Sequence, residues 1–343
     1  MSASIIKRVQ IEQIIAETAD AKTFILLPLD GWEPVYKPGQ FITLVFYTHS
    51  GEKRRSFSIS SVPGEPLSIT VKKVDNGEFS RLLIYKAAKG DILFTAGISG
   101  YFVLPETKSY ETFFFLAAGS GITPCFSLIK MLLFGSNKKV ILIYSNQSEA
   151  AAIFYSALQM LQQTYPERFQ VRFLFSNRNN VLESRLSHWL LSHLLAEFLP
   201  AERSTSLFFT CGPADYMIMV GISLRANGIQ SSQIIKEDFS PTTRTILPAP
   251  PDRDAHMVTI LINGATHHIN VQYPTSIVAT AKMHHIELPY SCEAGKCGSC
   301  AATCLSGVIW MAYNEVLVDE EIAKGRVLTC QGFAVGGDAT IQF

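Results

Sequence analysis

Four cysteines in the last quarter of the chain have the spacing of ligands that share one inorganic centre. They are Cys292, Cys297, Cys300 and Cys330. This C-x₄-C-x₂-C…C order is typical of a plant-type [2Fe–2S] site, in which thiolates hold two bridged irons. Gly295 and Gly298 fit a tight loop whose amide N–H groups point at sulfur, because glycine adopts left-handed conformations at little steric cost. The pattern predicts one-electron transfer.

Two other metal sites fit this pattern less well. A structural Cys₄ zinc site usually has two C-x₂-C pairs, and here only Cys297 and Cys300 form one. A Rieske centre needs two histidine ligands, but all eight histidines lie outside the cysteine loop. We expect Cys125 and Cys304 to be packed apolar residues rather than reactive thiols.

A second group of candidate residues lies in the first hundred positions. It comprises Arg55, Ser56, Phe57, Ser58, Gly77 and Ser80. The arginine offers a cationic fork for phosphate and the phenylalanine an aromatic face. One serine offers a hydroxyl for a ring edge, and the glycine turn opens toward a second hydroxyl. In this order the residues could hold a phosphate and a flat aromatic ring system.

A third group forms two turns, each directly after an apolar run. It comprises Gly119, Gly121, Thr123, Cys211, Gly212 and Pro213. The first turn opens a helix, where backbone N–H groups and the helix dipole attract an anion. It lacks the third glycine of the dinucleotide fingerprint. For Cys211 we favour a place in a crevice at the switch point of a sheet over that of a buried thiol at a strand end.

The elements that position these residues change in type along the chain. Residues 1–105 alternate short β-rich stretches with Gly and Pro turns, which predicts an antiparallel β-barrel. Residues 106–240 alternate apolar runs with helical stretches, which predicts a doubly wound parallel α/β domain. Residues 241–254 are rich in proline and read as a linker. Residues 255–343 open on a hairpin around Asn263-Gly264 and form the predicted ferredoxin-like α+β domain.

Composition limits the classes of function. The 343 residues carry no net charge, which argues against a nucleic-acid partner. No apolar stretch is long enough to span a bilayer, so we expect no membrane insertion. Seven cysteines without a secretion signal suit a reducing, cytoplasmic location. Residues 255–343 carry four basic and seven acidic side chains, so this part is weakly acidic and the rest weakly basic.

Together the motifs resemble those of the ferredoxin–NADP⁺ reductase superfamily with a C-terminal plant-type ferredoxin domain. The resemblance covers nearly the whole chain, and extends to the reductase of phenylacetyl-CoA epoxidase and to related reductases of oxygenases, desaturases and the hybrid-cluster protein. It implies a flavin barrel, a nicotinamide domain and a β-grasp domain, with FAD, a [2Fe–2S] cluster, and NADPH or NADH. It implies that an electron-accepting redox protein, such as an oxygenase or desaturase, is the partner.

The same resemblance implies roles for single residues. Arg55 would contact the flavin pyrophosphate, Phe57 the flavin, and Ser58 its reactive edge, while Gly77 and Ser80 would lie near phosphate. Thr123 and Cys211 would lie beside the nicotinamide, where the hydride is transferred, and Phe239 would cover the flavin. An ordinary core aromatic is the other reading of Phe239.

Three questions stay open at the level of sequence. Close relatives carry Asn-Arg where this chain has Asn146-Gln147, so the preference for NADH or NADPH is undecided. Residues 176–178 could supply a phosphate fork or form a solvated loop. The protein could also reduce small acceptors such as quinones or free flavins on its own, or carry a zinc-stabilised interaction module.

Overall fold

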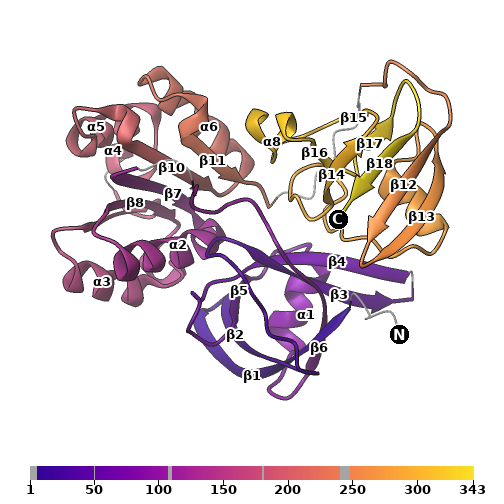
Figure 1. The fold of residues 1–343 in the computed structure, drawn as a ribbon. Helices are drawn as coiled ribbons and strands as arrows, with labels where there is room; N and C mark the ends of the chain where they lie inside the picture. The colour runs from indigo at the N-terminus through magenta and orange to yellow at the C-terminus, as the bar shows by residue number, and fades with distance from the viewer. Residues whose placement is uncertain (1–5, 50, 107–109, 180, 240–247) are drawn as a thin grey trace.

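The chain forms three lobes, which meet near the centre of the molecule (Figure 1). The computed structural model describes residues 6–49, 51–106, 110–179, 181–239 and 248–343. Of the predicted linker at 241–254, residues 241–247 lie outside this range.

The first lobe is a six-stranded antiparallel sheet in the order β4-β3-β6-β1-β2-β5. Its strands are β1 (Lys7–Thr18), β2 (Ala21–Pro28), β3 (Phe41–Thr48), β4 (Gly51–Ser58), β5 (Ser68–Lys72) and β6 (Ile92–Ser99). A bridge between Ile59 and Ile69 brings the two edges together, which makes the sheet a barrel. Inward-facing aliphatic residues fill it, and α1 (Glu78–Lys86) contributes Leu83 and Ile84 to this core.

The second lobe is a five-stranded parallel sheet in the order β11-β10-β7-β8-β9. Its strands are β7 (Thr112–Ala118), β8 (Lys139–Asn146), β9 (Phe169–Phe175), β10 (Ser206–Cys211) and β11 (Ile234–Glu237). Its helices are α2 (Ile122–Gly135), α3 (Tyr155–Thr164), α4 (Val181–Ser184), α5 (His188–Phe198) and α6 (Ala214–Ala226). The chain order reverses between β7 and β10, so the switch point of this sheet lies there.

Alternation along β7 explains why helices cover both faces of this sheet. All seven residues of the strand are buried. Phe115 and Ala117 pack with α2 and α3, whereas Phe114 and Leu116 pack with α5 and α6. A strand buried on both faces needs a continuous apolar run, which is what the sequence provides.

The third lobe has a β-grasp arrangement. Its five-stranded sheet runs β13-β12-β18-β14-β16, and β15 pairs with β17. The strands are β12 (His256–Ile262), β13 (Ala265–Val271), β14 (Ala301–Ser306), β15 (Ile309–Met311), β16 (Arg326–Leu328), β17 (Gly332–Ala334) and β18 (Ala339–Gln342). The helices are α7 (Ile277–Met283) and α8 (Asp319–Ala323). The predicted hairpin at Asn263-Gly264 and the predicted fold class are confirmed.

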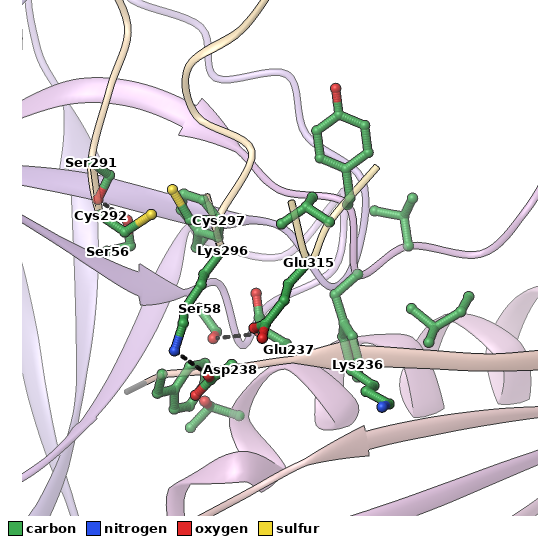
Figure 2. A pocket seen from close by; sticks show the side chains of 18 of the residues that line it. Ser56, Ser58, Lys236, Glu237, Asp238, Ser291, Cys292, Lys296, Cys297 and Glu315 are labelled. Atoms are coloured by element: carbon green, nitrogen blue, oxygen red, sulfur yellow. Dashed lines mark hydrogen bonds and ion pairs between the residues drawn. The ribbon is translucent and has the colours of Figure 1, made fainter. Parts of the chain in front are cut away.

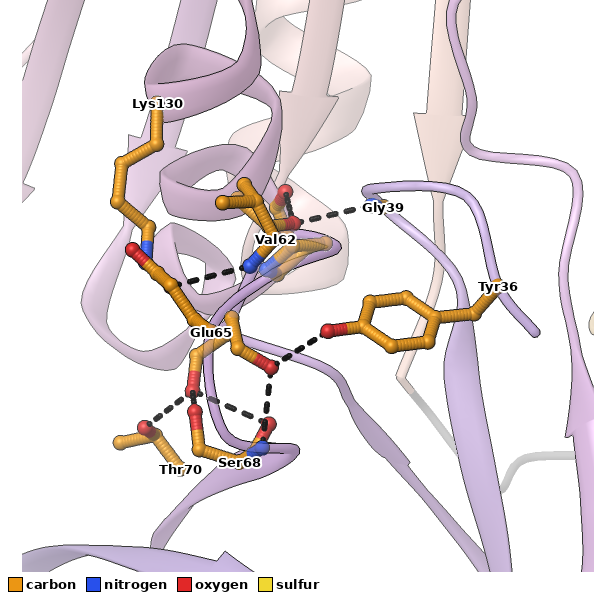
Figure 3. A network of polar contacts seen from close by, with 11 residues as sticks. Tyr36, Gly39, Val62, Glu65, Ser68, Thr70 and Lys130 are labelled. Carbon is orange, nitrogen blue, oxygen red and sulfur yellow. Dashed lines mark hydrogen bonds and ion pairs between the residues drawn. The ribbon is translucent and has the colours of Figure 1, made fainter. Parts of the chain in front are cut away.

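The barrel and the parallel-sheet lobe share a polar network beneath α2 (Figure 3). Lys130 of α2 pairs with Glu65 of the barrel. The Gly39 N–H donates to Ser127 Oγ at 2.9 Å. Gly39 has φ +89°, and a Cβ there would lie 1.8 Å from the Phe102 carbonyl oxygen. The same Cβ would lie 3.2 Å from Leu128 Cδ1 of α2, so the barrel backbone packs closely against this helix. Among the described residues, no helix is both long and apolar enough to cross a bilayer.

Candidate functional site

A cavity of about 1400 Å³ opens where the three lobes meet (Figure 2). Its wall includes residues from the barrel, from the edge of the parallel sheet and from the cysteine loop of the third lobe. The cavity is large enough for a dinucleotide-sized ligand. Two sequence motifs more than two hundred residues apart thus line one space.

The residues predicted for a flavin all line this cavity. They are Arg55, Ser56, Phe57, Ser58, Gly77 and Ser80. The arginine is exposed toward the cavity and lies over the Phe79 ring, 5.1 Å from its centroid. Ser58 is 4% exposed, and its hydroxyl donates to Glu237 Oε2 at 3.5 Å. The group offers a cation, an aromatic face and hydroxyls around one space.

The N-terminus of α1 supplies a second polar corner of the cavity. Gly77 is the residue before the helix, and Asn76, Ser80 and Lys72 line the wall nearby. The Ser80 hydroxyl donates to the Gly77 carbonyl at 3.2 Å and accepts from the Val74 N–H at 3.1 Å, so it stabilises the turn itself. Free N–H groups at a helix start, with a lysine beside them, fit phosphate.

The two predicted turns of the parallel sheet pack backbone against backbone at the switch point. A Cβ on Gly121 would lie 2.0 Å from the Cys211 carbonyl oxygen and 2.8 Å from the Gly212 nitrogen. Only a residue without a side chain allows this approach. Thr123 lines the cavity, with its hydroxyl donating to the Ser120 carbonyl at 2.9 Å. The structure does not place the other residues of this set on the cavity wall: Gly119, Gly121, Cys211, Gly212 and Pro213.

Cys211 is fully buried at the end of β10, in register with Glu237 of β11. Burial raises its pKa well above the ordinary value, and the nearby Glu237 raises it further. Cys125 behaves in the same way, which agrees with its predicted packing role. Cys304 is only partly buried and donates to the carbonyls of Ser306 and Gly307. Neither Cys125 nor Cys211 has the environment of a reactive thiolate.

Glu237 is a feature that the sequence motifs did not single out. Its carboxyl faces Ser58 across the cavity, and burial raises its pKa to about 8 while the Ser58 hydrogen bond lowers it. The carboxyl is therefore mostly protonated at neutral pH. The next residues also line the cavity: Asp238, and Phe239 with 45% of its surface exposed. The raised pKa of Glu237 is a consequence of its burial, and the local sequence does not show that this residue is buried.

The four predicted cluster cysteines fall into two sulfur pairs. Cys292 and Cys297 share a hydrogen bond, which lowers the pKa of the first and raises that of the second. Cys300 and Cys330 share another, with the same pattern. Cys292 and Cys297 line the cavity, whereas Cys300 and Cys330 are buried in the third lobe.

The backbone of this loop fits thiolates that carry negative charge. The Ala294 N–H donates to Cys292 Sγ at 3.4 Å, and the amides of Lys296 and Cys297 also bond this sulfur. The loop can aim them because Gly295 and Gly298 have φ values of +71° and +74°. Four cysteine sulfurs in two pairs are a ligand set that a [2Fe–2S] cluster can take.

An ion pair closes the cavity between the loop and the parallel sheet. Lys296 Nζ lies 2.8 Å from Asp238 Oδ2, and both side chains are largely buried (Figure 2). The pair joins the residue before a cluster cysteine to the residue before Phe239. Nothing in the spacing of either motif predicts it, because its members lie 58 positions apart.

Comparisons with known proteins agree with this geometry. Residues 260–335 match the family described as a 2Fe-2S iron-sulfur cluster binding domain, and residues 115–221 match an oxidoreductase NAD-binding domain. The chain is 30% identical to the ferredoxin reductase component of 3-ketosteroid-9-alpha-monooxygenase from Mycolicibacterium smegmatis, over 97% of this chain and 96% of that one.

Two further proteins resemble the chain along its length. A component of 1,2-phenylacetyl-CoA epoxidase from Escherichia coli is 31% identical over 97% of this chain and 96% of that one. The solved structure of phthalate dioxygenase reductase has a TM-score of 0.60 at 20% identity, and the match covers 98% of both chains. That structure shares the fold of all three lobes.

Proposed function

Since the chain belongs to the family of ferredoxin reductase components that serve oxygenases, we propose that it delivers electrons from a reduced nicotinamide to a partner oxygenase. A bound flavin would accept the hydride and release single electrons, which a bound [2Fe–2S] cluster would carry. One observation carries the proposal: Ser58, Cys292 and Cys297 line the same cavity.

The barrel side of the cavity would hold the flavin, which the family resemblance identifies as FAD. Arg55 offers its guanidinium to the pyrophosphate, and the start of α1 at Gly77 and Ser80 offers N–H groups. Phe57 would lie against the flavin and Ser58 at its reactive edge. The exposed Arg55 head and the lining hydroxyls support these roles.

The parallel sheet would hold NADH or NADPH. Gly119, Gly121 and Thr123 begin α2 at the switch point, where a pyrophosphate would meet helix N–H groups. For Cys211 we propose a place behind the nicotinamide, since its carbonyl fixes the close approach of the two turns. Phe239 borders the cavity from the end of the lobe. Glu237 holds its proton at neutral pH, so its carboxyl places no negative charge at this end of the cavity.

The third lobe would hold the cluster, with one iron on the Cys292–Cys297 pair and the other on the Cys300–Cys330 pair. The amides around Cys292 Sγ stabilise thiolate charge.

We further propose functional domains at 1–105, 106–240 and 255–343, joined by the linker at 241–254. The cytoplasm is the compartment that we propose, because a reducing environment preserves thiols for metal binding.

An anaerobic titration of the purified protein with NADH, and separately with NADPH, tests the proposal. We expect bleaching of the flavin absorbance, followed by the paramagnetic signal of a reduced [2Fe–2S] cluster. The nucleotide that acts at the lower concentration identifies the preference. A protein that contains stoichiometric zinc without iron, or that neither nucleotide reduces, would contradict the proposal.

A further inference from the structure

Arg54 projects from the same strand as Arg55 but makes a different set of contacts. Its side chain is 5% exposed, and Nε donates to Glu52 at 2.6 Å. Nη1 donates to the backbone carbonyls of Tyr290 at 3.2 Å and Leu288 at 3.4 Å. A buried guanidinium is stable only where such partners replace its water. Two of its three partners belong to the third lobe.

Tyr290 completes the contact from the other side. Arg54 Cζ and Lys282 Nζ each lie 3.8 Å from the centroid of the Tyr290 ring, so two cations contact the same aromatic ring. The Tyr290 hydroxyl donates a hydrogen bond to Glu52 Oε1 at 3.2 Å. The side chains of Glu52, Arg54 and Tyr290 form one closed set, which we call the seat.

The seat lies directly beside the cluster loop. Tyr290 precedes Ser291 and the ligand Cys292, and Ser291 Oγ lies 2.6 Å from Ser56 Oγ of the barrel. The contact therefore fixes the part of the third lobe that carries the sulfurs, rather than a remote surface. Electron transfer between two centres slows exponentially with their separation, so a small displacement of this loop would have a large effect on rate.

We propose that Arg54 and Tyr290 are positioning residues that seat the cluster loop against the flavin cavity and so set the rate of electron transfer between the two lobes. The proposal rests on the proposed function for the identity of the two centres. β4 then serves two lobes: Arg55 is exposed to the cavity, whereas Arg54, which also borders the cavity, is buried and bonds to the third lobe. The Lys296–Asp238 ion pair holds the loop from another side. We therefore expect the seat to fix the position of the loop, while the third lobe folds without it.

The test uses the full-length holoprotein and three variants: Arg54→Ala, Tyr290→Leu and the double variant. Hydrogen–deuterium exchange of residues 286–300 reports the seat without any turnover. We expect exchange in this segment to accelerate by about tenfold in each single variant, because a desolvated cation–π contact and charged hydrogen bonds are lost. The double variant should be no worse than either single one. Flavin and iron contents should stay those of the unaltered protein.

Two matched variants serve as controls. Arg8→Ala removes an exposed arginine, paired with Asp30 in the same barrel, and should leave the exchange of residues 286–300 unchanged. Tyr290→Phe keeps the ring and loses only the hydroxyl bond to Glu52, so it should restore most of the protection that Tyr290→Leu loses.

Rapid mixing with NADH then measures the two electron-transfer events separately. In Arg54→Ala and Tyr290→Leu, bleaching of the flavin by NADH should keep its rate, and reduction of the cluster should slow by about tenfold or more.

Three results would overturn the proposal: unchanged exchange in both single variants, unchanged cluster reduction despite faster exchange, or loss of flavin from Arg54→Ala. If nicotinamide fails to reduce even the unaltered protein, the proposed function fails, while the exchange data still decide whether the seat exists.

Discussion

The barrel contacts its two neighbours in two different ways. Toward the parallel sheet it shares an apolar core: Phe102 packs with Phe209 at 5.0 Å between ring centroids, within the cluster that also contains α2 and α3. Of the surrounding polar contacts, that of Gly39 with Ser127 is buried, and in the Lys130–Glu65 pair the lysine is largely buried while the Glu65 side chain is 37% exposed.

Toward the third lobe the barrel presents polar and cationic groups. Beyond the seat, Ser99 Oγ lies 3.0 Å from Ser299 Oγ, and the Tyr101 hydroxyl accepts from Arg326 at 2.8 Å. The Tyr101 ring packs on Gly298, where a Cβ would lie 2.4 Å from it. The third lobe has its own apolar core, to which Tyr101 is only a partly buried neighbour.

This difference shows which parts of the molecule depend on each other for folding. A shared apolar core makes the barrel and the parallel sheet one cooperative unit, because its burial stabilises both. Polar contacts between separately folded lobes contribute orientation, since each bond replaces one that water would make. We therefore expect the third lobe to be separable, and the first two lobes not to be.

Removal of residues 255–343 should abolish electron delivery to a partner protein, the largest effect predicted here, and should leave the fold of the first two lobes almost unchanged. We expect the shortened protein to retain flavin, to be reduced by nicotinamide and to melt within a few degrees of the flavin transition of the full protein. Delivery to a cluster-dependent acceptor should be abolished. Visible absorption and thermal melting measure both. Aggregation or loss of flavin would show that the third lobe is part of the core, and surviving delivery would favour a reductase of small molecules.

The sequence predicted the cluster loop well because its ligands are local. Three of four cysteines lie within nine positions, so spacing alone specifies the geometry. The hairpin at Asn263-Gly264 was predictable for the same reason, since both residues favour positive φ.

The seat could not be predicted in this way. Arg54 and Tyr290 lie 236 positions apart, and their contact exists only once the barrel and the third lobe are placed against each other. The same holds for the approach of Gly121 to Cys211 and for the raised pKa of Glu237. Burial and long-range contacts depend on the tertiary structure. A sequence motif reveals them only where function also constrains the spacing of its residues.

Phe102→Ala tests the shared core directly. Deleting a buried aromatic side chain typically costs about 3–5 kcal/mol, since the lost burial adds to the cavity that remains. At roughly 2–4 °C per kcal/mol for a unit of this size, the melting temperature should fall by about 10 °C. The matched control is Phe94→Ala, which removes the same side chain from a position that is 37% exposed and should change melting little. Similar shifts in both variants would remove the distinction between the interfaces.

Glu237 is a polar position at the edge of the shared core, and it predicts a pH dependence. Its pKa rises from the ordinary 4.5 to about 8 on folding, so between these values the folded chain holds one proton more than the unfolded chain. Stability should then fall as pH rises through this window, by about 1.4 kcal/mol per pH unit.

In Glu237→Gln this contribution should vanish, so the melting temperature between pH 5 and 8 should fall less steeply than in the unaltered protein. Glu12→Gln changes an exposed carboxyl in the barrel and should leave the slope as it was. Equal slopes in all three proteins would show that Glu237 is ionised in the folded state at neutral pH.

The smallest expected effects come from replacing one serine by alanine at each of the two interfaces. Ser127→Ala removes the acceptor of the Gly39 N–H inside the first interface, where Ser127 is fully buried, so the amide is left without a partner. This should cost about 1–3 kcal/mol. Ser99→Ala removes one hydroxyl of the Ser99–Ser299 pair, and because water can reach the half-buried Ser99 position, the cost should stay near roughly 0.5 kcal/mol. Thermal melting of the two variants side by side measures the difference. A larger loss for Ser99→Ala would mean that the third lobe, too, depends on the barrel for its stability.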